Sequence, residues 1–226
     1  MKILLFVWIL LFSTLLFAKS ENYSVQNIPK NMSVKEKKER FYALLVPAVK
    51  DVYDERMKLY LHIKEDLTEH RNGEKIKALK KKYRVKTDRA LLMALKPHPM
   101  SITLAQAAIE SAWGTSRFFR EANNIFGVHS VNPNEKSIDA RVKIGSRTVK
   151  VRKYKDLDAA IRDYYFMIAT VSKYQAFREM NYENRPVLEM VSGLEEYSER
   201  GQAYVKELRN IIRYNKLTKY DAKVIK

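Results

Sequence analysis

The chain has 226 residues, enough for one well-formed core or two small ones. Lys and Arg number 43 against 26 Asp and Glu, and the net charge of +17 predicts an anionic partner such as nucleic acid, a membrane surface or an acidic polymer. With 6 Gly, 6 Pro and no Cys, the composition argues against a β-sandwich and a Gly-rich nucleotide-binding fold, and it excludes disulfides and thiolate metal sites. It favours a mainly helical protein.

The first twenty residues, 1–20, are typical of a secretory signal peptide. A basic start precedes an uncharged run from Ile3 to Phe17, and the small residues Ala18 and Ser20 have the spacing that a signal peptidase needs. The run is shorter than the roughly 17–25 residues of a membrane-spanning helix, so cleavage is favoured over an uncleaved anchor. We therefore predict a periplasmic or secreted protein, whose available anionic partner is the cell envelope.

Residues 21–87 are predicted to form a linker and an N-terminal helical extension. Apolar residues recur at steps of three and four from Ser33 to about His70, and Pro47 is expected to kink or divide this helix. A short basic helix follows over residues 74–83. Together these features predict a solvated helical hairpin packed on the main domain.

Residues 88–216 are predicted to form the main domain, opening with a short helix at 89–96 for which Asp88 is the expected cap. The segment 101–112 is apolar almost all round, which indicates a buried central helix. Ser101 can cap its N-terminus, and Gly114 can close it in the left-handed conformation. Glu110 is the one ionisable residue of this helix.

The second half of the domain is expected to alternate short helices with one hairpin. Strands at 141–144 and 147–151 flank Gly145-Ser146, which suits a two-residue turn. The expected register pairs Val142 with Val149 and places Asp139 opposite Arg152. Further helices are predicted after Asp156, from Pro186 and over 199–214, followed by a frayed basic tail at 217–226.

Glu110 is the strongest candidate for chemistry. Burial disfavours an ionised carboxylate, so its pKa should rise and it should hold a proton near neutrality. A protonated acid in a cleft is what glycosidic bond cleavage requires for the leaving oxygen. Helical spacing places Gln106 and Trp113 on the same face, and an indole can stack on a sugar ring. Spacing alone leaves a second interpretation open, in which Glu110 hydrogen-bonds inside the core and Trp113 fills space.

Two motifs favour the catalytic interpretation of Glu110. Residues 105–114 read AQAAIESAWG, and residues 123–127 read NNIFG. Together they resemble the glucosaminidase domain of glycoside hydrolase family 73, and the WGTSRF that begins at Trp113 resembles its Bax-type branch. Weaker matches are YKDLDAAIRDY at 154–164 and the tyrosine-containing segments that begin at Tyr197 and Tyr204. The resemblance covers roughly residues 88–214.

The resemblance implies an α+β fold, mainly helical, with a lysozyme-like domain, a small β-hairpin lobe and preceding N-terminal helices. It implies a peptidoglycan hydrolase, an endo-β-N-acetylglucosaminidase that cuts the glycan strand after N-acetylglucosamine. The catalytic acid falls on Glu110 and the active-site tyrosine on Tyr197, while Asp139 is the nearest match for a second carboxylate and Glu135 the next. Residues expected to contact the substrate are Gln106, Trp113, Asn124, Phe126 and Tyr204.

The hairpin lobe departs from the family pattern because it is short and its matched acid is an Asp. Asp139 could instead form a cross-strand ion pair with Arg152. The acetamido group of the substrate could then assist in place of a second carboxylate. The choice between inversion and retention depends on the distance between carboxyl groups, which a sequence does not give.

Three other functions are weighed against this one. A lytic transglycosylase shares a helical Glu, but its usual phenylalanine after Glu-Ser and its later G-x-M-Q segment are missing from the sequence. A non-catalytic wall-binding module would keep the fold without activity. A zinc amidase is disfavoured because the four His residues are scattered, without an HExxH motif.

No cofactor, metal or nucleic-acid partner is therefore expected. Peptidoglycan glycan strands are the predicted partner. The basic surface is expected either to contact anionic wall or membrane groups peripherally or to be simply solvated, and the oligomeric state is left open.

Overall fold

The computed structural model describes residues 23–144 and 147–221. The predicted signal peptide, the turn at 145–146 and residues 222–226 lie outside this part. The helices are α2 (Val34–Thr68), α3 (Gly73–Tyr83), α4 (Asp88–Leu95), α5 (Met100–Glu110), α6 (Arg117–Ala122), α7 (Leu157–Thr170), α8 (Gln175–Tyr182), α9 (Val187–Met190) and α10 (Gln202–Tyr214). Strands β1 (Ser137–Ile144) and β2 (Arg147–Arg152) and the short 3-10 helices η1 (Ser172–Tyr174), η2 (Val191–Tyr197) and η3 (Leu217–Tyr220) complete the chain.

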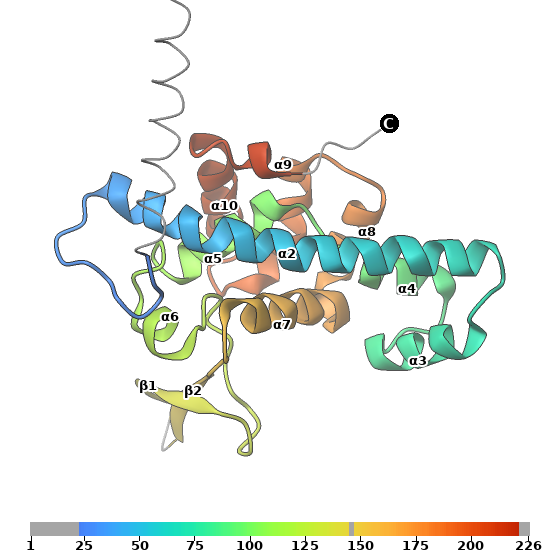
Figure 1. Cartoon of the computed structure of the whole chain (residues 1–226), viewed down its shortest axis with the longest axis horizontal. Helices are drawn as coiled ribbons and strands as arrows, with labels where there is room; N and C mark the ends of the chain where they lie inside the picture. The colour runs from blue at the N-terminus through green and yellow to red at the C-terminus, as the bar shows by residue number, and fades with distance from the viewer. Residues whose placement is uncertain (1–22, 145–146, 222–226) are drawn as a thin grey trace, which may run out of the picture.

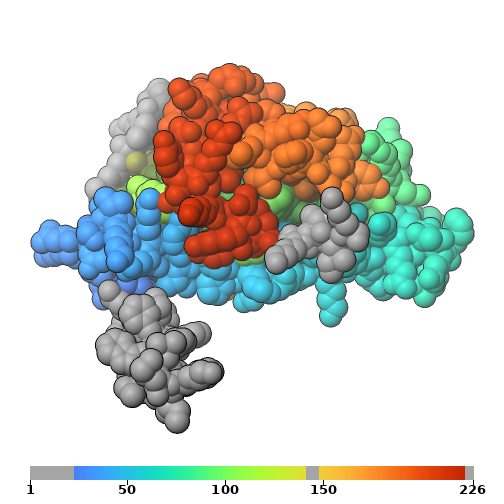
Figure 2. Space-filling view, turned by 90° about the horizontal axis from the view of Figure 1, so that it is seen from above, coloured from blue at the N-terminus to red at the C-terminus, as the bar shows by residue number. Residues whose placement is uncertain are grey.

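The expected class, mainly helical with a small β-hairpin lobe, is confirmed. α2 crosses the molecule, with α3 and α4 at one end and α6 and the hairpin toward the other (Figure 1). In the view from above, the C-terminal elements lie along α2 (Figure 2), and Tyr42 of α2 contacts the Tyr220 ring of η3. Within the described residues, no helix is both long and apolar enough to cross a membrane.

α2 is one continuous helix of 35 residues, begun by a capping box between Ser33 and Glu36. Pro47 does not divide it. Pro47 lies on the exposed side of the helix, where the carbonyl that loses its partner can bind water instead.

The inner face of α2 is part of the main core. Phe41, Leu45, Val49 and Val52 are fully buried in one hydrophobic cluster with residues of α5, α7 and α10. This half of α2 therefore packs on the main domain, as expected of the hairpin, but its inner face is part of the main core and is not solvated. The other half packs with α3 and α4 in a second cluster that includes Ile63, Ile76 and Leu91.

The central helix α5 is buried from Met100 to Ala108, as its apolar sequence predicted. Ser101 is not its N-cap. Instead, the Ser101 backbone N–H and hydroxyl both donate to the carboxylate of Asp221, each at 2.7 Å. The expected frayed tail is therefore wrong as far as Asp221, because Leu217 is fully buried and Asp221 supplies the acceptors that the helix start requires. The expected cap of α4 also differs, since the Thr87 hydroxyl accepts from the Ala90 N–H.

The hairpin keeps the expected register only near its turn. Lys143 pairs with Thr148, but farther along Ile138 pairs with Val151 and Asp139 with Lys150. Between the pairs Asp139–Lys150 and Lys143–Thr148, β1 has three residues and β2 has one, so a bulge shifts the pairing. The predicted pairing of Asp139 with Arg152 is therefore wrong.

Candidate active site

Glu110 is the last residue of α5 and is partly buried. The backbone of Gly127 passes directly over it, because a Cβ atom built on Gly127 would lie 3.8 Å from Glu110 Oε2. Burial raises the pKa of Glu110, against the opposing effects of a hydrogen-bonding interaction with the Tyr204 hydroxyl and of the charge on Arg200. The carboxyl is thus shifted toward its protonated form, as the sequence predicted.

A left-handed turn follows Glu110 directly. Ala112, Trp113 and Gly114 have φ values of 49°, 59° and 71°, a conformation that costs non-glycine residues energy. Two side chains hold the turn: the Ser111 hydroxyl accepts from the Gly114 N–H at 2.8 Å, and buried Arg40 of α2 donates to the Gly114 carbonyl at 2.8 Å. Arg40 had no signal in the sequence that connected it with this site.

The turn moves Trp113 away from the position that helical spacing predicted. Because α5 ends at Glu110, Trp113 no longer continues its face. Its ring packs edge-on against Phe41 and Tyr42 of α2 at centroid distances of 5.3 and 5.9 Å. The Lys38 ammonium lies 4.7 Å from the ring centroid.

The loop 123–127 is fixed by asparagine side chains. Asn124 is buried, and its amide donates to the carbonyls of Val128 and Arg152 at 2.9 and 2.8 Å while its oxygen accepts from the Val128 N–H at 2.9 Å. Gly127 has a φ of +67°, which suits glycine. Asn124 therefore joins the end of β2 to the loop that covers Glu110.

Several aromatic side chains pack at this loop. Phe126 stacks on Tyr164 with centroids 4.0 Å apart, and Tyr197 stacks on Tyr204 at 5.6 Å. The partly buried Tyr197 donates its hydroxyl to the Phe126 carbonyl at 3.4 Å. The structure thus brings Glu110, Phe126, Tyr197 and Tyr204 together from four separate segments.

Gln106 and Tyr204, predicted to contact substrate, are both buried and bonded to each other. The Gln106 Nε2 donates to the Tyr204 hydroxyl at 3.0 Å, and Gln106 Oε1 accepts from the Tyr164 hydroxyl at 2.5 Å. Tyr164 in turn contacts His98 Nε2 at 3.0 Å. Neither the Tyr164 contact with Gln106 nor that with His98 had a signal in the sequence.

The carboxylates of the hairpin lobe have different surroundings. Arg152 connects Glu135, at 2.8 Å from its Nε, with Asp163 of α7, at 2.6 Å from Nη1. Burial raises the pKa of Glu135, but hydrogen bonding from Ser130 and the charge of Arg152 outweigh burial, so that the pKa is lowered overall. Asp139 is exposed, and within the described residues its carboxylate is in no ion pair.

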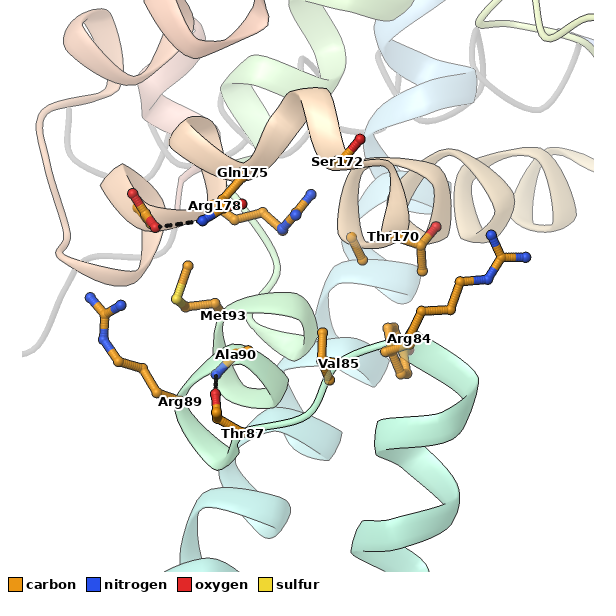
Figure 3. Close-up of a pocket in the computed structure, with 13 residues that line it drawn as sticks. Arg84, Val85, Thr87, Arg89, Ala90, Met93, Thr170, Ser172, Gln175 and Arg178 are labelled. Atoms are coloured by element: carbon orange, nitrogen blue, oxygen red, sulfur yellow. Dashed lines mark hydrogen bonds between the residues drawn. The ribbon is translucent and has the colours of Figure 1, made fainter.

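A separate cavity of about 450 Å³ lies between α3–α4 and α7–α8, at the end of the molecule away from the hairpin (Figure 3). It contains none of the predicted site residues. Arg178 extends into it, and its Nη1 donates to the carbonyls of Ile168 and Val171 at 2.8 Å. The lining residues are Tyr83, Arg84, Val85, Thr87, Arg89, Ala90, Met93, Ala169, Thr170, Ser172, Gln175, Arg178 and Glu179.

Comparison with known proteins identifies the family. The glucosaminidase family, described as mannosyl-glycoprotein endo-beta-N-acetylglucosaminidase, matches residues 89–217, more than half of the chain. The chain belongs to the glucosaminidase family. The match agrees with the range 88–214 over which the resemblance was predicted, and it includes Glu110, the loop 123–127 and Tyr197.

Individual relatives of this glucosaminidase-family chain are more distant. Protein bax of Escherichia coli is 26% identical over 144 residues in a comparison that covers 58% of this chain and 50% of that protein, so the chain spans about half the length of this relative. The catalytic domain of the autolysin Auto from Listeria monocytogenes is 18% identical, with a TM-score of 0.47 over 85% of this chain and 100% of that one. A peptidoglycan hydrolase from Sphingomonas sp. A1 is 21% identical, with a TM-score of 0.45 over 61% and 92%.

Proposed function

We propose that the chain is a peptidoglycan hydrolase of the endo-β-N-acetylglucosaminidase type, with Glu110 as its general acid. The observation that carries the proposal is the position of Glu110, at the end of a buried helix and beneath the backbone of Gly127, where burial raises its pKa. A raised pKa favours the protonated form of the carboxyl, which is the form that can give a proton to a leaving glycosidic oxygen. Membership of the glucosaminidase family supports the class of substrate.

In the proposed reaction, the bond between C1 of N-acetylglucosamine and the bridging oxygen breaks as Glu110 protonates that oxygen. A water then forms the new C1–O bond and loses one proton. That proton goes to a second carboxylate, which then releases it to solvent while Glu110 takes one up, or it returns directly to Glu110 if the acetamido oxygen of the substrate first attacks C1. One water is consumed, and the enzyme recovers its starting protonation.

We propose Asp139 as the second carboxylate and Glu135 as the alternative, in the order that the family resemblance implies. The exposure of Asp139 supports this order, since its carboxylate can approach a substrate without first leaving an ion pair within the described residues. Glu135 would have to give up the Arg152 guanidinium at 2.8 Å.

Tyr197 is proposed to bind the substrate or the attacking water. Its hydroxyl donates to the Phe126 carbonyl at 3.4 Å, a long hydrogen bond that costs little to exchange for a better acceptor. The burial of Asn124 and Phe126 supports a role in holding the loop around the site. Trp113 is proposed to contact the sugar with the part of its ring that stays exposed beside Phe41 and Tyr42 of α2.

The proposed place of action is the periplasm or the cell exterior, where peptidoglycan lies. The net charge of +17 supports contact with the carboxylates of peptidoglycan peptides or with anionic lipids.

The test is an analysis of the products released from purified sacculi by the mature chain, reduced with borohydride before mass spectrometry. The proposal predicts N-acetylglucosaminitol at the new ends. N-acetylmuramitol would contradict it in favour of a muramidase, and a 1,6-anhydromuramyl end would contradict it in favour of a lytic transglycosylase. Sedimentation with sacculi without any release would contradict it in favour of a binding module.

A further inference from the structure

A chain of buried hydrogen bonds leads to Glu110 from inside the core. It connects His98 to Tyr164 at 3.0 Å, Tyr164 to Gln106 at 2.5 Å and Gln106 to Tyr204 at 3.0 Å. All four side chains are at most 2% exposed. Such a series of polar groups is costly in a core unless each donor and acceptor is satisfied, so the direction of every bond can be worked out.

The two distances at Gln106 fix the orientation of its amide. The 2.5 Å contact with Tyr164 fits an O–H···O bond, and the 3.0 Å contact with Tyr204 fits an N–H···O bond. The amide oxygen therefore accepts from Tyr164, and the amide nitrogen donates to Tyr204. The reverse orientation would require an N–H···O bond of 2.5 Å, which is shorter than such bonds normally are.

The far end of the chain agrees with this direction. The Thr103 hydroxyl donates to Tyr165, and the Tyr165 hydroxyl donates to the His98 carbonyl. Since Thr103 and Tyr164 have both used their protons elsewhere, His98 Nε2 must carry a hydrogen and donate to them. Burial and the nearby charge of Arg56 lower the pKa of His98 to about 3, so the ring is neutral and holds this single proton.

The near end of the chain is then determined as well. Tyr204 already accepts from Gln106, and its own proton has no acceptor in the chain. Glu110 lies one helical turn from Gln106 on α5, and its interaction with the Tyr204 hydroxyl lowers the pKa of Glu110 and raises that of Tyr204, as expected when the hydroxyl faces the carboxyl. Burial keeps the Tyr204 hydroxyl protonated by raising its pKa, so it acts as a donor to Glu110 at every working pH.

We propose that Gln106 and Tyr204 are positioning residues that hold one oxygen of the Glu110 carboxyl, so that the catalytic proton stays on the other oxygen. This inference rests on the proposed function of Glu110 and changes the role of both residues from substrate contacts to internal supports. A carboxylic acid has one proton and two oxygens. A fixed donor on one oxygen therefore leaves the acid proton on the oxygen available to the leaving group.

The proposal predicts a specific pH effect. A hydrogen bond donated to a carboxylate favours its ionised form, so loss of the Tyr204 hydroxyl should raise the pKa of Glu110 further. A general acid works when protonated, and activity falls as the pH rises through its pKa. The alkaline limb of the pH–rate profile should therefore move to higher pH by about one unit in Tyr204→Phe, with kcat lower by about tenfold and KM within twofold.

Three further variants sharpen the test. Gln106→Leu leaves the Tyr204 hydroxyl in place but without its partner, so the same changes should appear with smaller size. The double variant should move the alkaline limb no farther than Tyr204→Phe alone, because both residues act through one bond to Glu110. Tyr165→Phe is the matched control, since it removes an equally buried hydroxyl that lies beyond His98, at the far end of the chain, and is hydrogen-bonded to none of Gln106, Tyr204 and Glu110 within the described residues. Its pH profile should match wild type even if its melting temperature falls.

The kinetic experiment uses soluble, peptide-free glycan strands so that kcat and KM are measured separately. A KM increase in Tyr204→Phe with an unchanged alkaline limb would overturn the inference in favour of direct substrate binding. An equal shift of the alkaline limb in Tyr165→Phe would overturn the inference, because loss of any buried hydroxyl would then change the pH profile in the same way.

A readout that needs no activity separates this inference from the proposed function. Carbon-13 NMR titration, with the Glu110 δ-carbon signal assigned by its loss in Glu110→Gln, follows the carboxyl directly. A higher Glu110 pKa in Tyr204→Phe supports the inference even if the chain cuts no glycan, and an unchanged value overturns it even if the chain is an active glucosaminidase.

Discussion

The end of α5 and the β-hairpin lobe both carry carboxyl groups, but the surroundings of these groups shift their pKa values in opposite directions. Glu110 is surrounded by the loop 123–127 and by tyrosines, and burial raises its pKa. Glu135 is held by Arg152, and its pKa is lowered. Carboxyl groups whose environments separate their pKa values can share the acid and base roles of one reaction. In the proposed function, the acid role falls to the helix end and the base role to the lobe.

The largest expected effect is at the helix end. Glu110→Gln keeps the shape of the side chain but has no proton to donate, so release of dyed fragments from sacculi should fall by about 10²-fold or more. Glu121→Gln on the neighbouring helix α6 is the matched control, because Glu121 is exposed and paired with Arg117 and Arg120. Activity of Glu110→Gln within tenfold of wild type would remove Glu110 from the acid role.

The hairpin lobe should respond next. If Asp139 activates the water, Asp139→Asn should lower activity by about 10²-fold and Glu135→Gln by less than about threefold, with the double variant resembling Asp139→Asn. Both single variants and the double variant are assayed on sacculi. Near-normal turnover in the double variant would show that the lobe supplies no catalytic carboxylate, and the acetamido route would replace it.

A smaller effect is expected at Tyr197, which lies between the two regions. Tyr197→Phe keeps the stack on Tyr204 but removes the hydroxyl, so kcat should fall by about three- to tenfold with little change in melting temperature. Steady-state kinetics and thermal melts are measured on the same preparations. Unchanged turnover would reduce Tyr197 to a packing role.

The smallest effect concerns stability. Because the folded-state pKa of Glu110 is raised, the folded chain holds this proton more tightly than the unfolded chain, and Glu110 lowers stability as the pH rises above about 4.3. Glu110→Gln should therefore melt at or above the wild-type temperature at pH 7, with the difference shrinking toward pH 4. A variant that melts well below wild type at pH 7 would indicate that Glu110 serves the core instead.

Local patterns predicted the helix that carries Glu110 because they depend on neighbouring residues. The apolar run at 101–108 predicts a buried helix, and the glycines at 114 and 127 can adopt a positive φ without strain. The structure has a positive φ at both glycines.

The supports of the site were not predictable because their partners are distant in sequence. Arg40 and Gly114 are 74 residues apart, and Ser101 and Asp221 are 120 apart. Gln106 was predicted to contact the substrate from the face of Glu110, and nothing in a linear sequence connects it with Tyr164 and Tyr204. A buried hydrogen-bond chain is a property of packing, which only the folded arrangement shows.

The two errors near the site have local physical causes. Trp113 was placed by helical spacing, which stops applying where Ala112 adopts a φ of 49°. Asp139 was paired by counting from the hairpin turn, and the bulge in β1 shifted the count. Left-handed turns of non-glycine residues and bulges both leave weak signals in a sequence, because neighbouring structure stabilises them.

The most direct test of the central claim is digestion of sacculi in water enriched in oxygen-18, with wild type and Glu110→Gln compared by mass spectrometry. The account predicts one heavy oxygen at each new N-acetylglucosamine reducing end in wild type, measured promptly before exchange, and almost no such ends in Glu110→Gln. Fragments that end in unlabelled 1,6-anhydromuramic acid, or labelled ends formed equally by Glu110→Gln, would contradict it.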